Sequence, residues 1–452
     1  MLRAVASTEN TIARPDRAPI GIPSSSDLRF AGLDGARAVA AMGVFLAHAA
    51  FISGYVFRSS LGPVLARADI GVEIFFLLSG FLLYRPFVAR RLAGQDARDL
   101  ASYARRRFLR IFPAYWVALT VIAFVLRAPP FSDEHSIVSH YLLLHVLDIR
   151  QVSHGPIQQA WTLSAELAFY VFLPCWAWLM ARRPRTPEKQ LRVEIAGLVA
   201  LWLGSMALKL AVIGMDLSIE RIGWLATWFP FRVDQFALGM ALAVTSVWIQ
   251  HRGIRLPAWF RGAPGVLGCW ALALGAFLVL SFGFHLPLDL EFTPKQFWFT
   301  RTVFSFIALA FLAPIVLGRQ DGGVMRRVVA NRPVVWLGLI SYGIYLWHEA
   351  WMFKYLEWTD KPALAAPFLP LVAVTLVLTL VTGAASWYLI ERPAMGWTFR
   401  TVAGERRRPG RPLGDGAPDG GAPAGDGPGD ASRTDDTTRV VPESDPAPSA
   451  ER

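Results

Sequence analysis

Long apolar stretches alternate with short polar segments along most of this chain. About ten of the stretches approach the ~20 apolar residues with which an α-helix crosses a bilayer. They lie at about residues 33–53, 71–89, 108–126, 161–180, 194–213, 230–250, 264–284, 298–317, 333–354 and 367–390. The pattern predicts an all-α, polytopic integral membrane protein with about ten transmembrane helices. A shorter stretch at 137–147 is typical of a re-entrant or interfacial piece.

The polar segments predict the orientation of these helices. Lysines and arginines number 22 in the N-terminal segment and alternate loops, and 7 in the intervening loops. Loops rich in Lys and Arg stay in the cytoplasm, so both termini are expected there. Hydrophobic residues make up 54% of the 452 residues, which is too many for a soluble protein of this length. The net charge of +11 therefore reflects topology, and no nucleic-acid partner is expected.

The two ends of the chain differ from the apolar region. Residues 1–32 are polar and predict a cytoplasmic N-terminus without a cleavable signal peptide. Residues 33–393 form the predicted membrane domain. Residues 394–452 are rich in Gly, Pro and Asp, and from about residue 402 they contain no aromatic side chain. Such a composition cannot bury enough apolar surface to fold, so a disordered cytoplasmic tail is expected.

Two ionisable residues, Arg37 and His48, lie eleven positions apart in the first apolar stretch. Ionisable groups inside membrane helices are costly and indicate function. Eleven residues make about three helical turns, which place both side chains on nearly one face, ~16 Å apart along the axis. This layout suits a site that holds an anion near the membrane surface and carries out proton chemistry deeper in the membrane.

Further polar residues are expected near the depth of His48 on other helices. Glu166, Asp234 and His348 each fall in the predicted outer half of the membrane, and Arg232 lies beside Asp234. Four helices would then contribute to one buried layer. The alternatives are structural: an ion pair of Asp234 with Arg232 or Arg37, an interfacial histidine at 348, and a pairing of Glu166 with a nearby arginine.

On the predicted cytoplasmic side, several arginines gather at the start of the third helix. Arg107 and Arg110 follow Arg105 and Arg106 there, and Arg37 lies at the same end of the first helix. Guanidinium groups bind phosphates in bidentate fashion. The run at 105–107 also fits a purely topological role, whereas Arg110 lies further into the helix.

Taken together, these motifs resemble the membrane-bound acyltransferase 3 family of integral membrane O-acyltransferases, from about residue 33 to residue 393. The resemblance is carried by LDGARAVAAMGVFLAHA, GVEIFFLLSGFLLYRPF, YARRRFLRIFPAYW, WTLSAELAFYVFLP, FRVDQFALG, ISYGIYLWHEAW and WYLIERP, in the family's order. The family's Arg-x10-His element falls on Arg37 and His48, and its Arg-x-x-Arg element on Arg107 and Arg110. Its acidic residue falls on Glu166. The chain lacks the extra hydrolase-like domain of some members, which implies a stand-alone transferase.

The resemblance implies transfer of an acyl group, often acetyl, from cytoplasmic acyl-coenzyme A to a hydroxyl. The implied acceptors are an envelope carbohydrate, a lipid or a glycosylated small molecule, and the implied location is a bacterial cell membrane. No permanently bound cofactor and no metal are expected.

These implications lead to a mechanistic hypothesis. Arg37, Arg107 and Arg110 hold the coenzyme A phosphates, His48 is the general base, and Glu166 orients its imidazole. Arg232 or Tyr342 would stabilise the oxyanion. A covalent acyl-histidine is the competing chemistry, and the sequence does not separate the two routes.

Two other classes of function stay open at this point. A ten-helix protein with intramembrane His, Asp and Glu also fits a proton-coupled transporter or exporter of a saccharide or lipid precursor. A non-catalytic envelope scaffold is the third reading, although a scaffold has no reason to bury costly polar groups. The outward segment 127–160 carries four histidines, and we expect them to be solvated in a loop that faces the acceptor.

Overall fold

The protein is described by a computed structural model that covers residues 28–396, except residues 96–98, 128–130, 132, 153, 184, 216, 285, 289–291 and 319–322. The side chains of residues 28–31 and 326 are also outside the description. The chain divides into two units, Met1–Glu405 and Arg406–Arg452. The second unit and nearly all of the predicted tail lie outside the described residues, as does most of the polar N-terminus, so these assignments stay predictions.

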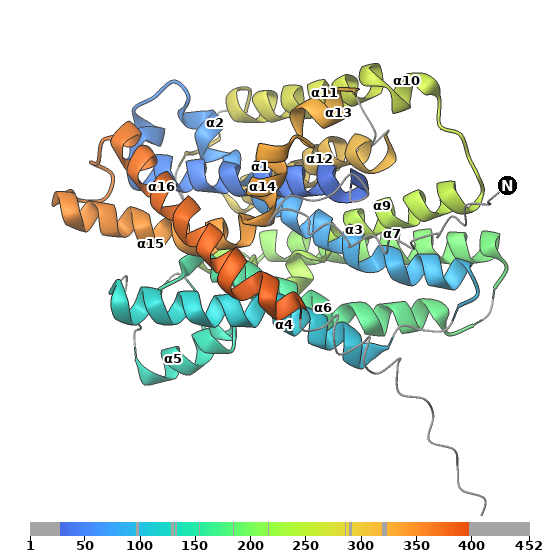
Figure 1. Cartoon of the computed structure of the whole chain (residues 1–452), viewed down its shortest axis with the longest axis horizontal. Coiled ribbons are helices and arrows are strands. Elements are labelled where there is room, and N and C mark those ends of the chain that lie inside the picture. Colours follow the sequence, from blue (N-terminus) through green and yellow to red (C-terminus); the bar gives the residue numbers. More distant parts are fainter. Residues whose placement is uncertain are drawn as a thin grey trace, which may run out of the picture. The chain divides into compact units, whose positions relative to one another are not determined.

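The described residues form helices and contain no strand, which confirms the all-α fold class. Figure 1 shows the long helices side by side, with α16 crossing the others obliquely. The long helices are α1 (Leu28–Ile52), α3 (Gly71–Leu92), α4 (Leu100–Thr120), α6 (Trp161–Ala181), α7 (Pro187–Ile213), α9 (Val233–His251), α11 (Ala263–Phe282), α12 (Pro294–Leu317), α15 (Ser341–Thr359) and α16 (Phe368–Ser386). The short helices are α2 (Gly62–Ala66), α5 (Glu134–Tyr141), α8 (Ile219–Leu225), α10 (Ala258–Arg261), α13 (Gly323–Val328) and α14 (Arg332–Leu339).

Single-turn or π-helical pieces join several of these helices. They are η2 (Tyr55–Phe57), η3 (Ala68–Ile70), η4 (Val121–Val125), η5 (His145–Leu147), η6 (Gln158–Ala160), η7 (Phe229–Phe231) and η8 (Trp387–Glu391). Of these, η4 and η8 are π-helical and directly continue α4 and α16.

Eight helical segments among the described residues are long and apolar enough to cross a membrane. They coincide, to within two residues where a predicted span runs past the segment, with eight of the ten predicted spans, and they make this a multi-pass membrane protein. The other two predicted spans fall on α9 and on α14 with α15, which do not reach that measure. Both α9 and α15 turn acidic side chains toward the protein interior, which lowers their hydropathy while keeping charge away from lipid. The number of spans and the side on which the termini lie stay predictions.

The central helices are α1 and α3. In their most apolar windows 61% and 67% of residues are buried, against 22% in α7 and in the segment of α16. The first helix packs against α3, α14 and α15. The side chains of α1 and α3 therefore meet protein on most sides, whereas α7 and α16 expose apolar side chains such as Leu210 and Val377 at the periphery.

Small residues bring α3 and α9 unusually close together. A Cβ atom on Gly80 would lie 2.3 Å from the Phe236 carbonyl oxygen, and one on Gly239 would lie 2.1 Å from the Leu77 carbonyl oxygen. Glycine at both positions permits backbone contact, which is how membrane helices gain van der Waals packing without a hydrophobic driving force.

The segment between α4 and α6 departs from the expectation of solvated histidines. His135 and His154 are exposed, but His140 and His145 are each only 1% exposed, and their rings stack with centroids 4.5 Å apart. The indole groups of Trp224 and Trp228 both donate to the carbonyl of Val146, and this ties η5 to the α8 region. Burial lowers the pKa of His145 to about 3, so this ring is neutral. The stacked histidine rings and the indole hydrogen bonds thus take the place of water around this segment, which packs against the membrane domain.

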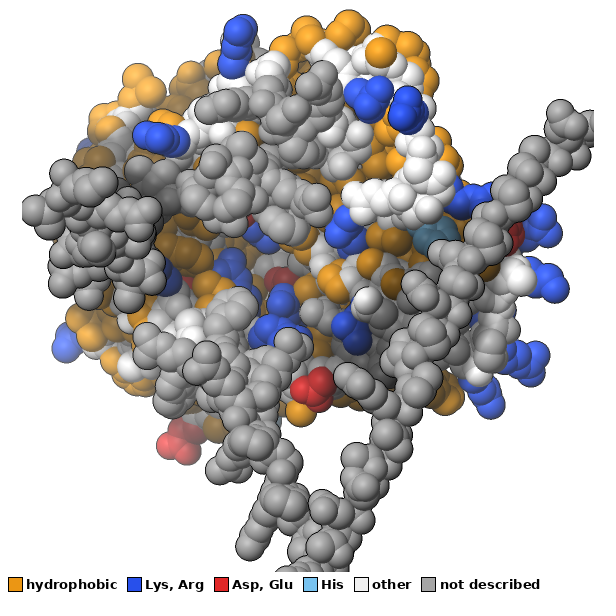
Figure 2. Space-filling view, turned by 45° about the vertical axis from the view of Figure 1, so that its right-hand side comes forward, with side chains coloured by type: hydrophobic (Ala, Val, Ile, Leu, Met, Phe, Trp, Pro, Cys, Tyr) orange, Lys and Arg blue, Asp and Glu red, His pale blue; other side chains and the backbone are white. Residues whose placement is uncertain are grey.

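One face of the protein is strongly basic. Figure 2 looks at the side on which α3 ends, and Lys and Arg side chains there far outnumber Asp and Glu. Blue side chains also lie inside a hollow at the centre of this face. This is the face that the loop charges assign to the cytoplasm.

Candidate active site

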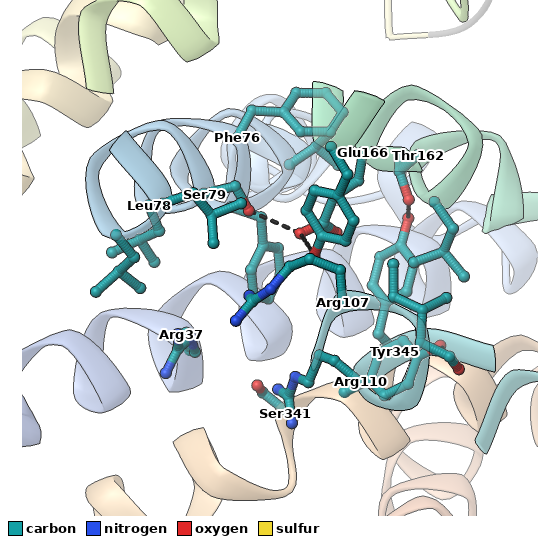
Figure 3. Close-up of a pocket in the computed structure, with 18 residues that line it drawn as sticks. Arg37, Phe76, Leu78, Ser79, Arg107, Arg110, Thr162, Glu166, Ser341 and Tyr345 are labelled. Carbon is teal, nitrogen blue, oxygen red and sulfur yellow. Dashed lines mark hydrogen bonds between the residues drawn. The ribbon is translucent and has the colours of Figure 1, made fainter. Parts of the chain in front are cut away.

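A cavity of about 120 Å³ lies between α1, α3, α4, α6 and the start of α15. Figure 3 shows that side chains from all five helices point into the same space. It is lined by Arg37, Val72, Phe75, Phe76, Leu78, Ser79, Leu82, Leu83, Arg107, Arg110, Ile111, Thr162, Leu163, Glu166, Tyr170, Ser341, Tyr342 and Tyr345. Four of the five residues predicted to act in catalysis or donor binding therefore line one cavity, although they come from three separate helices.

The three predicted donor-binding arginines share one region of the cavity (Figure 3). Arg37 pairs with Asp34 one turn earlier, and Arg110 pairs with Glu391 at 3.2 Å. Arg107 makes no ion pair with the residues that the structure describes, and its guanidinium carbon lies 5.8 Å from the centre of the Tyr170 ring. A guanidinium held by an aromatic face and free of a carboxylate is available to an anionic ligand.

Glu166 faces the cavity but does not contact His48. Its Oε1 atom accepts hydrogen bonds from Ser79 at 2.8 Å and from the Tyr170 hydroxyl at 2.7 Å. The Glu166 carboxylate thus joins α6 to α3. It also fixes the Tyr170 ring, against which the Arg107 guanidinium lies. The predicted pairing of Glu166 with the imidazole is replaced by a role in the cavity wall, because Glu166 has two donors close by on α3 and α6.

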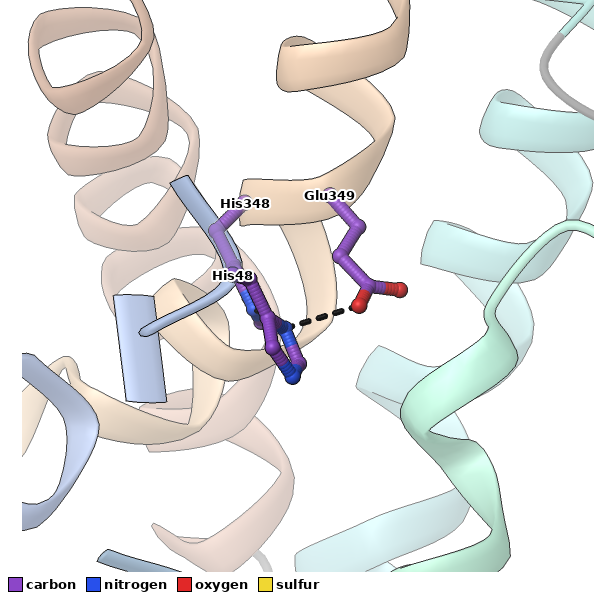
Figure 4. Close-up of side chains that lie close together, drawn as sticks. All are labelled: His48, His348 and Glu349. Atoms are coloured by element: carbon purple, nitrogen blue, oxygen red, sulfur yellow. Dashed lines mark hydrogen bonds and ion pairs between the residues drawn. The ribbon is translucent and has the colours of Figure 1, made fainter. Parts of the chain in front are cut away.

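His48 instead contacts two neighbouring residues of α15, which are 300 and 301 positions away in the chain. Its Nδ1 atom lies 2.7 Å from Glu349 Oε1 and 2.9 Å from His348 Nε2. The two imidazole rings stack on each other, as Figure 4 shows. Their centroids are 5.1 Å apart. His48 is partly accessible, since 29% of its side chain is exposed, whereas His348 and Glu349 are buried.

Hydrogen bonds fix the tautomers of this cluster. His348 Nδ1 lies 3.0 Å from the Ile344 carbonyl and 2.9 Å from the Tyr345 carbonyl, so it carries the proton and leaves its Nε2 as an acceptor. The Nδ1 atom of His48 faces that acceptor and a carboxylate oxygen, so it must also carry a proton. In the neutral ring, the Nε2 atom of His48 then holds the lone pair.

The same cluster has the residue types of a metal site, because its three ligand atoms lie within 4.8 Å of one another. Two ligands on one tetrahedral zinc ion at ~2.1 Å would be separated by about 3.4 Å. The contacts of His48 Nδ1 are shorter than that and match direct hydrogen bonds. The donor set therefore fits a hydrogen-bonded base better than a metal centre.

Asp234 and Arg232 belong to a separate group of buried contacts. Asp234 pairs with Lys209 at 2.8 Å and accepts from Ser205 at 3.0 Å. Arg232 donates to the Ala226 carbonyl and lies 3.5 Å from Glu73. Neither predicted alternative for Asp234 occurs, because its partner is on α7. These groups hold α3, α7 and α9 together, and none of them lines the cavity.

Tyr342 lines the cavity with its hydroxyl already engaged. The hydroxyl donates to the Ile111 carbonyl at 2.9 Å, and the ring lies 5.7 Å from the Arg110 guanidinium carbon. The predicted oxyanion role therefore has no free donor here, and Tyr342 instead fixes Arg110.

Glu349 is the site residue that sequence reasoning passed over. It follows His348 directly in LWHEAW, and successive helical residues point about 100° apart. The sequence did carry a signal for Glu349, because His348 and Glu349 are two adjacent ionisable residues in an apolar stretch and both are costly in a membrane.

Comparison with known proteins bears on the whole described region. The family model described as an acyltransferase domain matches residues 30–390. Acyltransferase MdmB of Streptomyces mycarofaciens is 27% identical over 396 residues, which is 81% of this chain and 92% of that protein. Peptidoglycan O-acetyltransferase OatA of Listeria monocytogenes is 26% identical over 332 residues, which is 70% of this chain but only 48% of that protein. No solved structure matches the chain.

Proposed function

Since this chain belongs to the acyltransferase 3 family and is a membrane O-acyltransferase, we propose that its donor is a cytoplasmic acyl-coenzyme A and that His48 is its general base. The observation that carries the proposal is a cavity with three guanidinium groups near a histidine–glutamate–histidine cluster. Arg37 and His48 mark the two levels on one face of α1, ~16 Å apart along the axis.

The arginines are suited to the phosphates of coenzyme A. A pyrophosphate and a 3′-phosphate need several cations, and guanidinium groups bind them through paired hydrogen bonds. Arg107 supplies a charge without a carboxylate partner among the described residues, while Arg37 and Arg110 are positioned by Asp34 and Glu391. The long pantetheine arm then reaches through the apolar part of the cavity toward His48.

The His48 cluster is suited to base catalysis. The Nε2 atom of His48 takes the proton of the acceptor hydroxyl while the hydroxyl oxygen attacks the thioester carbonyl. The tetrahedral intermediate then expels the coenzyme A thiolate as the C–S bond breaks, and the imidazolium returns its proton to that sulfur. Glu349, at 2.7 Å from Nδ1, stabilises the positive charge that the ring carries between these steps. A covalent acyl-histidine would use the same Nε2 atom as nucleophile.

Glu166 is a positioning residue in this proposal. It holds the Tyr170 hydroxyl, and the Tyr170 ring in turn lies beside Arg107. Loss of Glu166 would therefore weaken donor binding more than it slows the chemical step.

The acceptor is a hydroxyl of an envelope carbohydrate, a lipid or a glycosylated small molecule, and the protein resides in a bacterial cell membrane. One relative is named for O-acetylation of peptidoglycan, which supports a saccharide hydroxyl. Part of the His48 side chain is accessible, so an acceptor can approach the base. We expect the approach from the outer side, where the loop charges place this end of α1.

The test is transfer of label from radiolabelled acetyl-coenzyme A in membranes that contain equal amounts of wild type, His48→Ala or His251→Ala. His251 is an exposed histidine at the end of α9 and serves as the matched control. We expect a labelled product with wild type and His251→Ala and none with His48→Ala. Equal labelling with His48→Ala would remove this residue from the chemistry.

Two further outcomes of this experiment discriminate between the remaining mechanisms. Label that stays on the wild-type protein when acceptor is withheld, and disappears when it is added, supports the acyl-histidine route. Absence of labelled product from wild type with every envelope fraction and acyl-coenzyme A tried would overturn the proposed donor.

A further inference from the structure

One face of α3 follows the length of the cavity. Phe75, Ser79 and Leu82 are spaced at i, i+4 and i+7, all line the cavity and are only partly buried. Their neighbours Ile74 and Leu77 are buried in the core and do not line the cavity. This spacing places the three side chains in a row on one helical face. Phe75 and Leu82 are therefore about 10 Å apart along the axis.

Phe75 occupies the part of the row next to Tyr345. Their rings meet edge to face, with centroids 6.1 Å apart and planes at 72°. Aromatic rings at this separation are in van der Waals contact, so an acyl chain that extends into the space of either ring has to displace it. Phe75 also packs against the apolar cluster of Ala41, Ile340 and Ile344.

Tyr345 is the fixed partner of this pair. Its hydroxyl lies 2.8 Å from the Thr162 hydroxyl and donates to the Gln159 carbonyl at 3.0 Å (Figure 3 shows the Thr162 contact). The Gln159 side chain amide returns a hydrogen bond to the Tyr345 carbonyl at 2.8 Å. Two contacts to the hydroxyl hold the ring, and the third fixes the Tyr345 backbone against η6.

Tyr345, which Phe75 contacts, lies between the cavity and the base. Tyr345 lines the cavity, and its ring centroid is 5.9 Å from that of His348, which in turn stacks on His48. His48 itself does not line the cavity. A thioester that reaches His48 along this path must therefore place its acyl group against Phe75 and Tyr345.

We propose that Phe75, backed by Tyr345, sets the maximum acyl chain length and restricts the donor to acetyl and other very short acyl groups. The inference rests on the proposed donor and on the direction in which it enters. A methyl group fits beside two rings that already touch, whereas each added methylene has to displace a ring. Tyr345 is held by hydrogen bonds, so Phe75 is the residue whose size decides the limit.

The experiment compares acetyl-, butyryl- and hexanoyl-coenzyme A as donors for wild type, Phe75→Ala and Phe75→Leu. Leu82→Ala is the matched control, since it removes a similar apolar volume from the same helical face and the same cavity, about 10 Å away. Wild type should use acetyl-coenzyme A and transfer hexanoyl poorly. The hexanoyl-to-acetyl ratio of kcat/KM should rise at least about tenfold in Phe75→Ala and by less in Phe75→Leu.

The outcomes separate this inference from the proposed function. If the Phe75 variants transfer acetyl with an unchanged ratio, the inference is wrong while the donor assignment stands. A ratio that rises equally in Leu82→Ala, or a wild type that already transfers hexanoyl as well as acetyl, also overturns it. Failure of wild type with all three donors would instead overturn the proposed donor. Phe75→Leu keeps most of the packing, so the test does not depend on whether the alanine variant folds.

Discussion

Replacement of Glu349 by glutamine tests the assignment of the carboxylate that supports His48. The amide keeps the size of the side chain and an oxygen that accepts from Nδ1, so the 2.7 Å contact is retained and only the charge is lost. His348 remains as the second neighbour of Nδ1. The substitution therefore isolates the electrostatic contribution of Glu349 to the imidazolium formed during the reaction.

The size of the effect follows from the geometry. A hydrogen bond to a charged group contributes about 1.5–3 kcal/mol. Opposite charges ~4 Å apart attract by about 4 kcal/mol at an effective dielectric constant of ~20, which suits this mostly buried site. Because about 1.4 kcal/mol changes a rate tenfold, kcat should fall by about 10- to 1000-fold. The KM for acetyl-coenzyme A should change little, since Glu349 does not line the donor cavity.

The assay is steady-state transfer of labelled acetyl by purified protein in detergent or nanodiscs, with kcat and KM determined separately. Glu357→Gln is the matched control, because Glu357 lies on the same helix and pairs with Lys354 at an exposed position. A Glu349→Gln protein with kcat within about threefold of wild type would refute the reasoning. A rise in KM with unchanged kcat would move Glu349 from the chemistry to donor binding.

Four further predictions follow from other features. Arg107→Gln should raise the KM for acetyl-coenzyme A by about 10- to 100-fold with little change in kcat, whereas Arg105→Gln, outside the cavity, should not. Gly239→Ala should destabilise the protein by about 1–3 kcal/mol, because a Cβ atom at this position would lie 2.1 Å from the Leu77 carbonyl oxygen of α3. Gly204→Ala, where a Cβ atom meets open space, should be neutral, and thermal unfolding of both variants tests the difference. Because burial lowers the pKa of His145 to about 3, only the unfolded segment binds its proton between that value and ~6.5. The hydrogen-exchange protection factors of residues 134–147, which correct for the slower intrinsic exchange at low pH, should therefore fall as pH falls below ~6.5, and should not do so in His145→Phe. Chelators should leave acyl transfer unchanged, and loss of activity that zinc restores would contradict the hydrogen-bonded reading of the His48 cluster.

The membrane architecture was largely predictable from the sequence. In lipid, the backbone N–H and C=O groups of an apolar segment must form their hydrogen bonds within the segment. Such a segment therefore forms a helix whatever its tertiary contacts are. The same reasoning identified Arg37, His48, Arg107, Arg110 and Glu166 as costly groups, and four of them line one cavity. Of the ten predicted spans, only those on α9 and on α14 with α15 are not long and apolar enough to count as membrane-spanning helices. Buried polar residues such as Asp234 and His348 interrupt the apolar stretch there.

The expected solvated histidines show why local composition misleads in connecting segments. The sequence of residues 127–160 is polar enough to be a loop, but the rings of His140 and His145 stack in the interior. Their burial depends on indole groups of α8 and its neighbouring turn, about 80 residues away, which bond to the Val146 carbonyl. No pattern within the segment itself contains that information.

What the sequence determined by itself was the set of helices, their expected order across the membrane and the ionisable residues that a membrane would not otherwise tolerate. Only the tertiary structure decided which of these residues meet. Rotation of each helix about its axis selects Glu349 rather than Glu166 as the partner of His48, and it assigns Asp234 to Lys209. The hydropathy of a helix is the same however the helix is rotated about its axis, so hydropathy does not select one rotation. The rotation depends on backbone contacts at glycines and on hydrogen bonds between helices that are distant in the sequence, and these form only when the chain packs.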